Sequence, residues 1–119
     1  MAPEDIRELF SVFGAVDLRR LFGGTGIFAD GTMFALLHDG VVYLKIDEES
    51  APAFEREQLE AFSYSRNGER ASLASYRRMP DRLYDDPDEL STWARAALAA
   101  AQRSGARKSP AKARRQRKS

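Results

Sequence analysis

Apolar and polar positions alternate most regularly between Arg19 and Asp47, where β-prone apolar runs are separated by short polar breaks. Two of these breaks are Asp-Gly pairs, at residues 30–31 and 39–40. Asp-Gly favours a tight turn because both residues tolerate a positive φ angle. The pattern therefore predicts three consecutive antiparallel strands joined by two hairpins. With two-residue turns, the opposed pairs would be Phe28 with Met33, Ala35 with Leu44, and Leu37 with Val42.

That register assigns a set of side chains to each face of the sheet, because strand residues alternate between faces. The predicted core face carries Phe28, Met33, Ala35, Leu37, Val42, Leu44 and Ile46. The opposite face carries Ile27, Phe34, Leu36 and Tyr43. A face with four such large side chains is not typical of a sheet surface that meets water, so it needs a cover. We favour another layer of the same chain or a dimer partner over a ligand.

Helical spacing of apolar residues predicts helices before and after these hairpins. The first covers residues 3–13, and a short one is expected at about residues 52–59. The last begins at Pro87 and has the clearest boundaries. Its signals are Asp86 as the N-cap, Glu89 completing a capping box, and Ser104-Gly105 as the stop.

Two more strands are expected after the short helix. Residues 62–65 alternate in polarity, residues 71–78 can return beside them, and Asn67-Gly68 is typical of the turn between them. The predicted fold class is therefore α+β, with a hairpin-rich antiparallel sheet of about five strands flanked by an N-terminal and a C-terminal helix. Residues 1–104 form the predicted domain. Residues 105–119 have no large apolar side chain and are expected to be a disordered basic tail.

The composition excludes several classes of protein. At 119 residues the chain is long enough for one domain with a modest core. It has no cysteine, which excludes disulfides, thiolate metal sites and cysteine nucleophiles. No apolar run is long enough to cross a bilayer, and the N-terminus lacks the pattern of a secretory signal. We therefore expect a cytoplasmic protein without a membrane partner.

Charge is divided unevenly along the chain. The sequence has 19 basic and 18 acidic residues, yet eight of the basic ones and none of the acidic ones lie from Arg103 onward. Residues 1–102 thus hold 11 basic against 18 acidic residues, a net charge of −7, and the remainder carries +8. This division is typical of an acidic globular module with a basic arm.

Few residues suggest catalysis or cofactor binding. The glycines at residues 23–26 lack the spacing and the following helix of a phosphate loop, so we interpret them as a bulge or a place where bulky side chains pack. His38 is the only histidine, and it has neither a second histidine or cysteine for a metal nor a nucleophile motif. The acidic clusters at residues 47–49 and 85–86 are interpreted as helix boundaries. No catalytic, cofactor-binding or metal-binding residue is predicted.

Two surfaces are predicted to bind partners. The basic arm has the charge of a phosphate-binding segment, and its expected nucleic-acid contacts are Arg107, Lys108, Lys112, Arg114, Arg115, Arg117 and Lys118. Phosphate contacts give affinity without sequence preference. The alternative is a tail that only adds solubility. The expected protein contacts are on and beside the apolar second face, at Arg20, Phe22, Ile27, Phe34, Leu36 and Tyr43.

Five stretches carry a resemblance to a known family. They are RRLFGGTGIFADGTMFAL (residues 19–36), VYLKID (42–47), FSY (62–64), SYRRMPD (75–81) and DDPDELSTWARAALAAA (85–101). In this order they resemble the TfoX/Sxy N-terminal domain family, bacterial proteins linked to the regulation of competence genes. The resemblance implies an α+β fold, no enzymatic activity, and a co-activator role beside the cyclic-AMP receptor protein. It also implies a second, helical domain in full-length members, at the place where this chain has its basic segment.

These patterns lead to a hypothesis about function. The chain is expected to be a non-enzymatic regulatory adaptor, whose domain binds a protein partner such as a transcription regulator and whose tail contacts DNA without sequence preference. Two alternatives stay open. One is a small-ligand-binding module with a pocket beside residues 23–26, and the other is a homodimeric domain with an incidental tail. No cofactor is expected.

Overall fold

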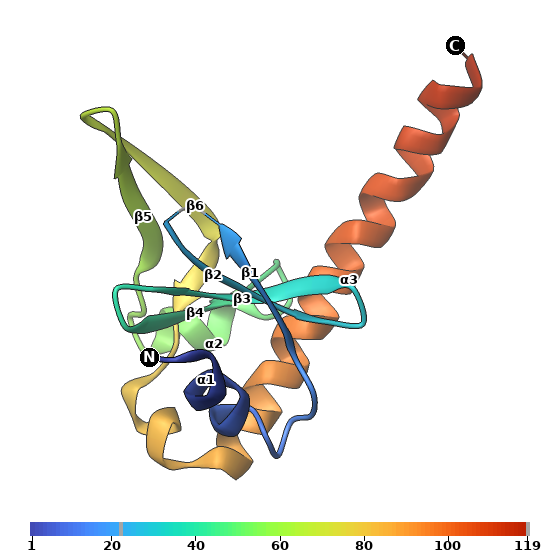
Figure 1. The fold of residues 1–119 in the computed structure, drawn as a ribbon. Coiled ribbons are helices and arrows are strands. Elements are labelled where there is room, and N and C mark those ends of the chain that lie inside the picture. The colour runs from blue at the N-terminus through green and yellow to red at the C-terminus, as the bar shows by residue number, and fades with distance from the viewer. Residues whose placement is uncertain (22, 119) are drawn as a thin grey trace.

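The computed structural model describes the backbone of residues 1–21 and 23–118, and the side chains of residue 66 and of residues 106–119 lie outside its described part. The elements can be followed in chain order in Figure 1. They are α1 (Pro3–Leu9), β1 (Asp17–Leu21), β2 (Gly24–Ala29), β3 (Thr32–His38), β4 (Val41–Lys45), α2 (Ala51–Arg56), β5 (Ala61–Arg66), β6 (Glu69–Arg78), the 3-10 helix η1 (Asp81–Asp85) and α3 (Pro87–Lys118).

The strands of the described residues form one antiparallel sheet of six strands, in the order β1-β2-β3-β4-β6-β5. Together with the N-terminal and C-terminal helices, this sheet confirms the predicted α+β class. The prediction of about five strands missed β1, because three strands were predicted in the region where the structure has β1, β2, β3 and β4. Gly23, with a φ of 74°, belongs to the reversal between β1 and β2. A short edge strand with little alternation of polarity is hard to recognise from sequence.

The hairpin turns agree with the prediction. Their residues have positive φ angles at Asp30 and Gly31 (52° and 76°), Asp39 and Gly40 (51° and 76°), and Asn67 and Gly68 (53° and 79°). Two successive positive φ angles define the turn type that best matches the twist of paired strands. The three opposed pairs expected from these turns, including Phe28 with Met33, are all present.

A β-bulge in β3 changes which face several side chains occupy. Ile27 pairs with Ala35, but the next residue, Phe28, pairs with Met33, so Phe34 has no opposite partner in β2. One extra residue reverses the alternation on one side of the bulge. Ile27 and Phe34 therefore lie in the main core, and Met33 packs against the second cluster of apolar residues. The predicted assignment of these residues to faces is wrong for this reason.

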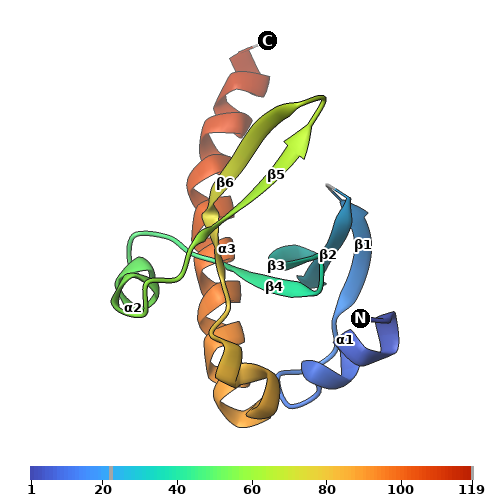
Figure 2. The same cartoon turned by 90° about the vertical axis from the view of Figure 1, so that its left-hand side faces the viewer.

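The sheet has apolar residues on both faces. On one face, α1 and α3 cover the main core, to which β3 and β4 contribute Ala35, Leu37, Val42 and Leu44. On the other face, the β5–β6 hairpin bends over the sheet, as Figure 2 shows. A second core lies beneath it, formed by Leu36, Phe62 and Tyr76, with Met33, Tyr43, Tyr64 and Leu73 beside them. The cover that the second face requires thus comes from the same chain.

The helices differ from the predicted ones mainly at their ends. α1 stops at Leu9, earlier than the expected residue 13, and α2 covers Ala51–Arg56 where residues 52–59 are predicted. The predicted N-cap of α3 is confirmed, because Asp86 Oδ1 accepts the Glu89 N–H at 3.1 Å. The Glu89 carboxylate does not complete a capping box with the Asp86 N–H, which donates to the Leu83 carbonyl oxygen instead.

The predicted end of the last helix at Ser104-Gly105 is wrong, since the backbone of α3 continues to Lys118. One glycine costs a helix only about 1 kcal/mol relative to alanine. The residues that follow are mostly Ala, Arg, Lys and Gln, which favour helix, although Pro110 among them opposes it. The last turns of α3 extend beyond the sheet in Figure 1. The domain boundary after Ser104 and the disorder of residues 105–119 stay predictions.

Candidate functional site

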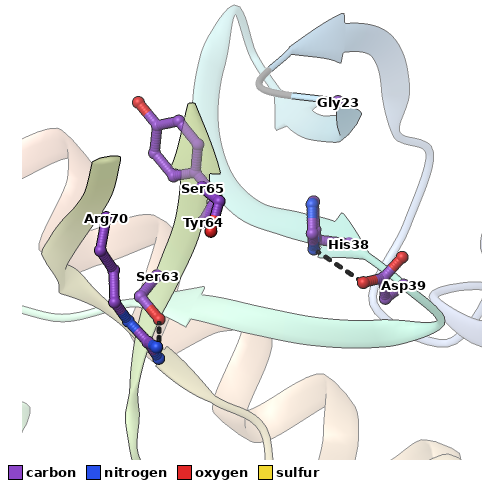
Figure 3. A pocket seen from close by; sticks show the side chains of 7 residues that line it. All are labelled: Gly23, His38, Asp39, Ser63, Tyr64, Ser65 and Arg70. Atoms are coloured by element: carbon purple, nitrogen blue, oxygen red, sulfur yellow. Dashed lines mark hydrogen bonds and ion pairs between the residues drawn. The ribbon is translucent and has the colours of Figure 1, made fainter. Parts of the chain in front are cut away.

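A groove runs between the β5–β6 hairpin and the end of β3, and Figure 3 shows the side chains around it. It has a volume of about 790 Å³. Its lining consists of Gly23, His38, Asp39, Ser63, Tyr64, Ser65 and Arg70. Ser63, Tyr64 and Ser65 are consecutive in β5, and their side chains must alternate between faces. The groove therefore follows the free edge of β5, the last strand of the sheet.

His38 is the residue of this groove whose side chain can act as an acid, a base or a metal ligand. Its side chain is 23% exposed. Its ring meets Phe62 edge to face at a centroid distance of 5.2 Å. Its Nδ1 lies 3.7 Å from Asp39 Oδ2, beyond hydrogen-bond distance. Among the described residues, no hydroxyl group is hydrogen-bonded to this imidazole, so the groove does not present a nucleophile and its base.

Tyr64 is the aromatic residue that lines the groove. Its ring stacks on the buried ring of Phe62 at 5.6 Å with an interplanar angle of 17°, and Tyr43 meets the same Phe62 ring at 4.9 Å. Burial, followed by the negative charge of Glu60, raises the pKa of the Tyr43 hydroxyl above its ordinary value of 10.0. On the polar side, Arg70 Nη2 donates a hydrogen bond to Ser63 Oγ at 3.0 Å. Such a groove can bind a small polar molecule that has a flat apolar part.

The predicted protein-contact residues are not brought together on one surface. Ile27, Phe34 and Leu36 are completely buried, so they do not lie on a surface where they could contact a partner as predicted. Because of the bulge, the side chains of Ile27 and Phe34 lie in the main core, and the β5–β6 hairpin covers Leu36. Tyr43 is half-buried beside the groove and Arg20 is exposed on β1. Phe22 lies outside the described residues.

The predicted nucleic-acid contacts, residues 107–118, belong to the part of α3 whose side chains are not described. The first cation of the basic segment, Arg103, belongs to the domain instead. Its guanidinium donates to both carboxylate oxygens of Asp47, at 2.6 and 3.0 Å, and lies 2.7 Å from Glu49 Oε2. Sequence reasoning missed this pairing, because 56 residues separate Arg103 from Asp47 and no local pattern connects them.

Asp47 is a structural carboxylate. Its side chain is only 7% exposed, and its Oδ1 accepts the backbone N–H groups of Glu49 and Ser50, both at 3.1 Å. The hydrogen bond from Arg103 is the main cause that lowers the pKa of Asp47 below its ordinary value of 3.8. This confirms that the acidic cluster at residues 47–49 leads into a helix. The same cluster also binds α3, because Asp47 and Glu49 contact Arg103 of that helix.

Two further observations limit the chemistry of the described residues. They contain no group of three or more His, Cys, Asp and Glu side chains placed to hold a metal ion. Within the same residues, no helix is both long enough and apolar enough to cross a membrane.

The sequence of the chain matches a known protein family. The family model described as the TfoX N-terminal domain matches residues 8–101, which includes all six strands and most of the helical cover. This chain belongs to the TfoX N-terminal domain family. The resemblance predicted from five sequence stretches is thereby confirmed.

A curated relative of this TfoX N-terminal domain is Protein Sxy of Escherichia coli strain K12. The two are 31% identical over 71 residues, which cover 60% of this chain and 34% of Protein Sxy. The match thus spans about a third of the relative's length.

Proposed function

We propose that this TfoX N-terminal domain is a non-enzymatic regulatory domain, which binds a protein partner and contacts DNA through its basic C-terminal segment. One observation carries the proposal. Residues 1–102 have a net charge of −7, and Arg103 is paired within the domain, so the sequence from residue 107 to residue 118 adds seven cations and no acidic residue. Charge segregated in this way favours an arm that binds a polyanion while the domain does not.

The family supports the regulatory part of this proposal. Competence regulation is the role that the resemblance implies for the family, and the groove offers no assembled catalytic group among the described residues. A co-activator needs a surface for another protein and a way to stay near DNA. In this proposal the acidic domain binds the other protein, and the basic segment keeps the chain near DNA.

DNA binding by the segment has a defined dependence on salt. If about six cations contact phosphates, the logarithm of the affinity falls with the logarithm of the salt concentration at a slope of about −5, because condensed counterions are released. Affinity should differ little between DNA sequences, because phosphate contacts carry no base information.

The test is a titration of duplex DNA at several salt concentrations, with the full chain and with a chain that ends at Ser104. The shorter chain keeps Arg103 and its contacts with Asp47, so its domain stays intact. We expect only the full chain to bind, with the steep salt slope. Equal binding by both chains would move the DNA site onto the domain, and absence of binding by both would refute the role of the segment.

A second candidate function is binding of a small ligand in the groove beside β5. The observation that favours it is that the half-buried imidazole of His38, the ring of Tyr64 and the guanidinium of Arg70 line the same groove. A bound ligand would raise the melting temperature by mass action. We expect Tyr64→Ala to abolish that rise if the ligand stacks in the groove, and a rise of equal size in this variant would exclude the groove.

A further inference from the structure

A second hollow lies on the opposite edge of the sheet, between α1 and β1. Its volume is about 430 Å³, and it is lined by Met1, Pro3, Ile6, Arg7, Leu18, Arg19, Arg20 and Thr25. Three of these residues are arginines, and none of the described lining residues is a carboxylate. The hollow is therefore a cationic surface on a domain whose net charge is −7.

These arginines differ from others in the same domain. Arg82 pairs with Glu57 and Glu89, and Arg103 pairs with Asp47 and Glu49. In the described part of the chain, none of the three arginines of the hollow makes an ion pair with a carboxylate. An acidic domain that leaves three arginines of two adjacent elements without carboxylates presents a site for an anionic partner.

The acidic residues of α1 and β1 are not among the residues that line this hollow. α1 also carries Asp5 and Glu8, but these two side chains line a different hollow, beside Tyr84 and Pro87. The remaining acids of the two elements are Glu4 on α1 and Asp17 at the start of β1, and neither lines the hollow. The charged side chains of the lining are thus the three arginines.

One arginine is held in place by an aromatic ring. The Arg19 guanidinium carbon lies 4.8 Å from the centroid of Phe28, within the range of a cation–π contact. A guanidinium placed in advance loses less side-chain entropy when it binds a carboxylate.

The position of β1 adds a second, independent property. β1 is the first strand in the sheet order, and β2 is its only partner among the described strands. The backbone N–H and C=O groups on its other edge therefore have no strand partner in the described part of the chain. Arg19 and Arg20 are neighbours, so their side chains leave the strand on opposite faces. An extended chain laid along this edge would meet a cation on each face.

We propose that the edge of β1 binds an extended acidic segment of a partner protein, which adds a strand to the sheet and places carboxylates beside Arg7, Arg19 and Arg20. This inference rests on the proposed function and specifies the chemistry of its protein partner. A peptide is favoured over nucleic acid because only a peptide can use the backbone groups of the strand edge as well as the arginines. β-strand addition gives affinity through the backbone, and the arginines select acidic side chains.

The proposal can be tested by fluorescence anisotropy with the full chain. The probe is a labelled peptide of about ten residues that alternates Glu and Val, a length that matches a β-strand. We expect Arg19→Glu and Arg20→Glu each to weaken its binding by at least about fivefold, since an ion pair at a partly exposed site contributes up to about 1 kcal/mol and reversal adds repulsion. The matched control is Arg95→Glu, which makes the same charge change at an exposed position of α3. It should change binding by less than about twofold.

Three outcomes would overturn the proposal. The first is equal weakening by Arg95→Glu and Arg20→Glu, which would mean attraction by overall charge only. The second is unchanged binding of the same peptide after N-methylation of alternate residues, which removes the hydrogen bonds of an added strand. The third is a single-stranded oligonucleotide that binds more tightly than the peptide and depends on the same arginines, which would make the hollow a phosphate site.

The result is independent of the DNA test. A chain that ends at Ser104 should bind the acidic peptide with the affinity of the full chain, because α1 and β1 are unchanged, whereas it should lose DNA binding. Far-ultraviolet circular dichroism and the melting temperature show whether each variant is folded. Arg20→Glu is the decisive variant here, because Arg19 also contacts Phe28 and its loss can destabilise the fold.

Discussion

The contact between Asp47 and Arg103 is expected to hold the C-terminal half of the domain together. Asp47 follows β4 and Arg103 lies in α3, so their contact fastens the helix to the loop before α2. The substitution Asp47→Asn keeps the size of the side chain and removes its charge. It therefore tests the carboxylate itself, and not the packing around it.

The magnitude follows from the contacts that the carboxylate makes. It accepts two hydrogen bonds from the Arg103 guanidinium, two from backbone N–H groups and one from the Ser50 hydroxyl, at distances of 2.6 to 3.3 Å. A hydrogen bond to a charged group contributes about 1.5–3 kcal/mol, and the amide of asparagine can keep only some of these contacts. We expect a loss of about 2 kcal/mol at pH 7, which lowers the melting temperature by about 8 °C in a domain of this size.

The difference between the parent chain and Asp47→Asn should depend on pH in a definite direction. The pKa of Asp47 in the folded protein is lower than its ordinary value of 3.8, so the unfolded chain binds a proton more readily. The stabilisation is therefore complete above about pH 5 and is lost as the pH falls through the folded-state pKa. Urea denaturation at about pH 7, 5 and 3 measures the difference directly.

A matched control separates the specific contact from a general effect of charge. Glu55→Gln removes one negative charge from an exposed position of α2 and should change stability by less than about 0.5 kcal/mol. Arg103→Met should cost nearly as much as Asp47→Asn, and the double variant little more than either. The reasoning would be refuted if Asp47→Asn cost no more than Glu55→Gln, or if its cost did not shrink at low pH.

Two further predictions concern the sheet. Gly24→Ala should lower the free energy of unfolding, measured by urea denaturation, by about 3 kcal/mol, because the new Cβ would overlap the backbone carbonyl of Leu37. Gly26→Ala should lower it by only about 1 kcal/mol, because its Cβ would meet the ends of side chains. Equal losses in the two variants would contradict this explanation. Tyr84→Phe removes the acceptor of the Val42 N–H, 2.8 Å away, and should cost about 1–2 kcal/mol. Amide exchange at Val42 should then be faster, and unchanged exchange would disprove the role of the hydroxyl.

Local features of this fold could be predicted from the sequence because they depend on the dihedral preferences of a few adjacent residues. The Asp-Gly and Asn-Gly turns adopt the expected positive φ angles, and the Asp86 side chain caps α3 as expected. The division of charge is a property of the sequence alone. The five family stretches were also sufficient to identify the family.

The faces of the sheet were decided by the tertiary structure. The bulge at Phe34 has no distinctive residue in the sequence, and its effect is to pack the Phe34 ring against Phe10 and Phe13, at centroid distances of 5.6 and 5.0 Å. Those two rings come from the segment at the end of α1, so no window around β3 contains the information. A single extra residue then reverses every assignment on one side of it.

The groove and the cationic hollow depend on contacts between segments that are far apart in the sequence. The groove beside β5 exists because the β5–β6 hairpin bends over the sheet, and the cationic hollow exists because α1 brings Arg7 beside β1. Sequence by itself determined the turns, the helix cap, the family and the charge of each segment, which are local or additive properties. Only the tertiary structure decided which side chains are buried, that Arg103 belongs to the domain, and which arginines have no carboxylate partner, because these depend on packing between residues far apart in the chain.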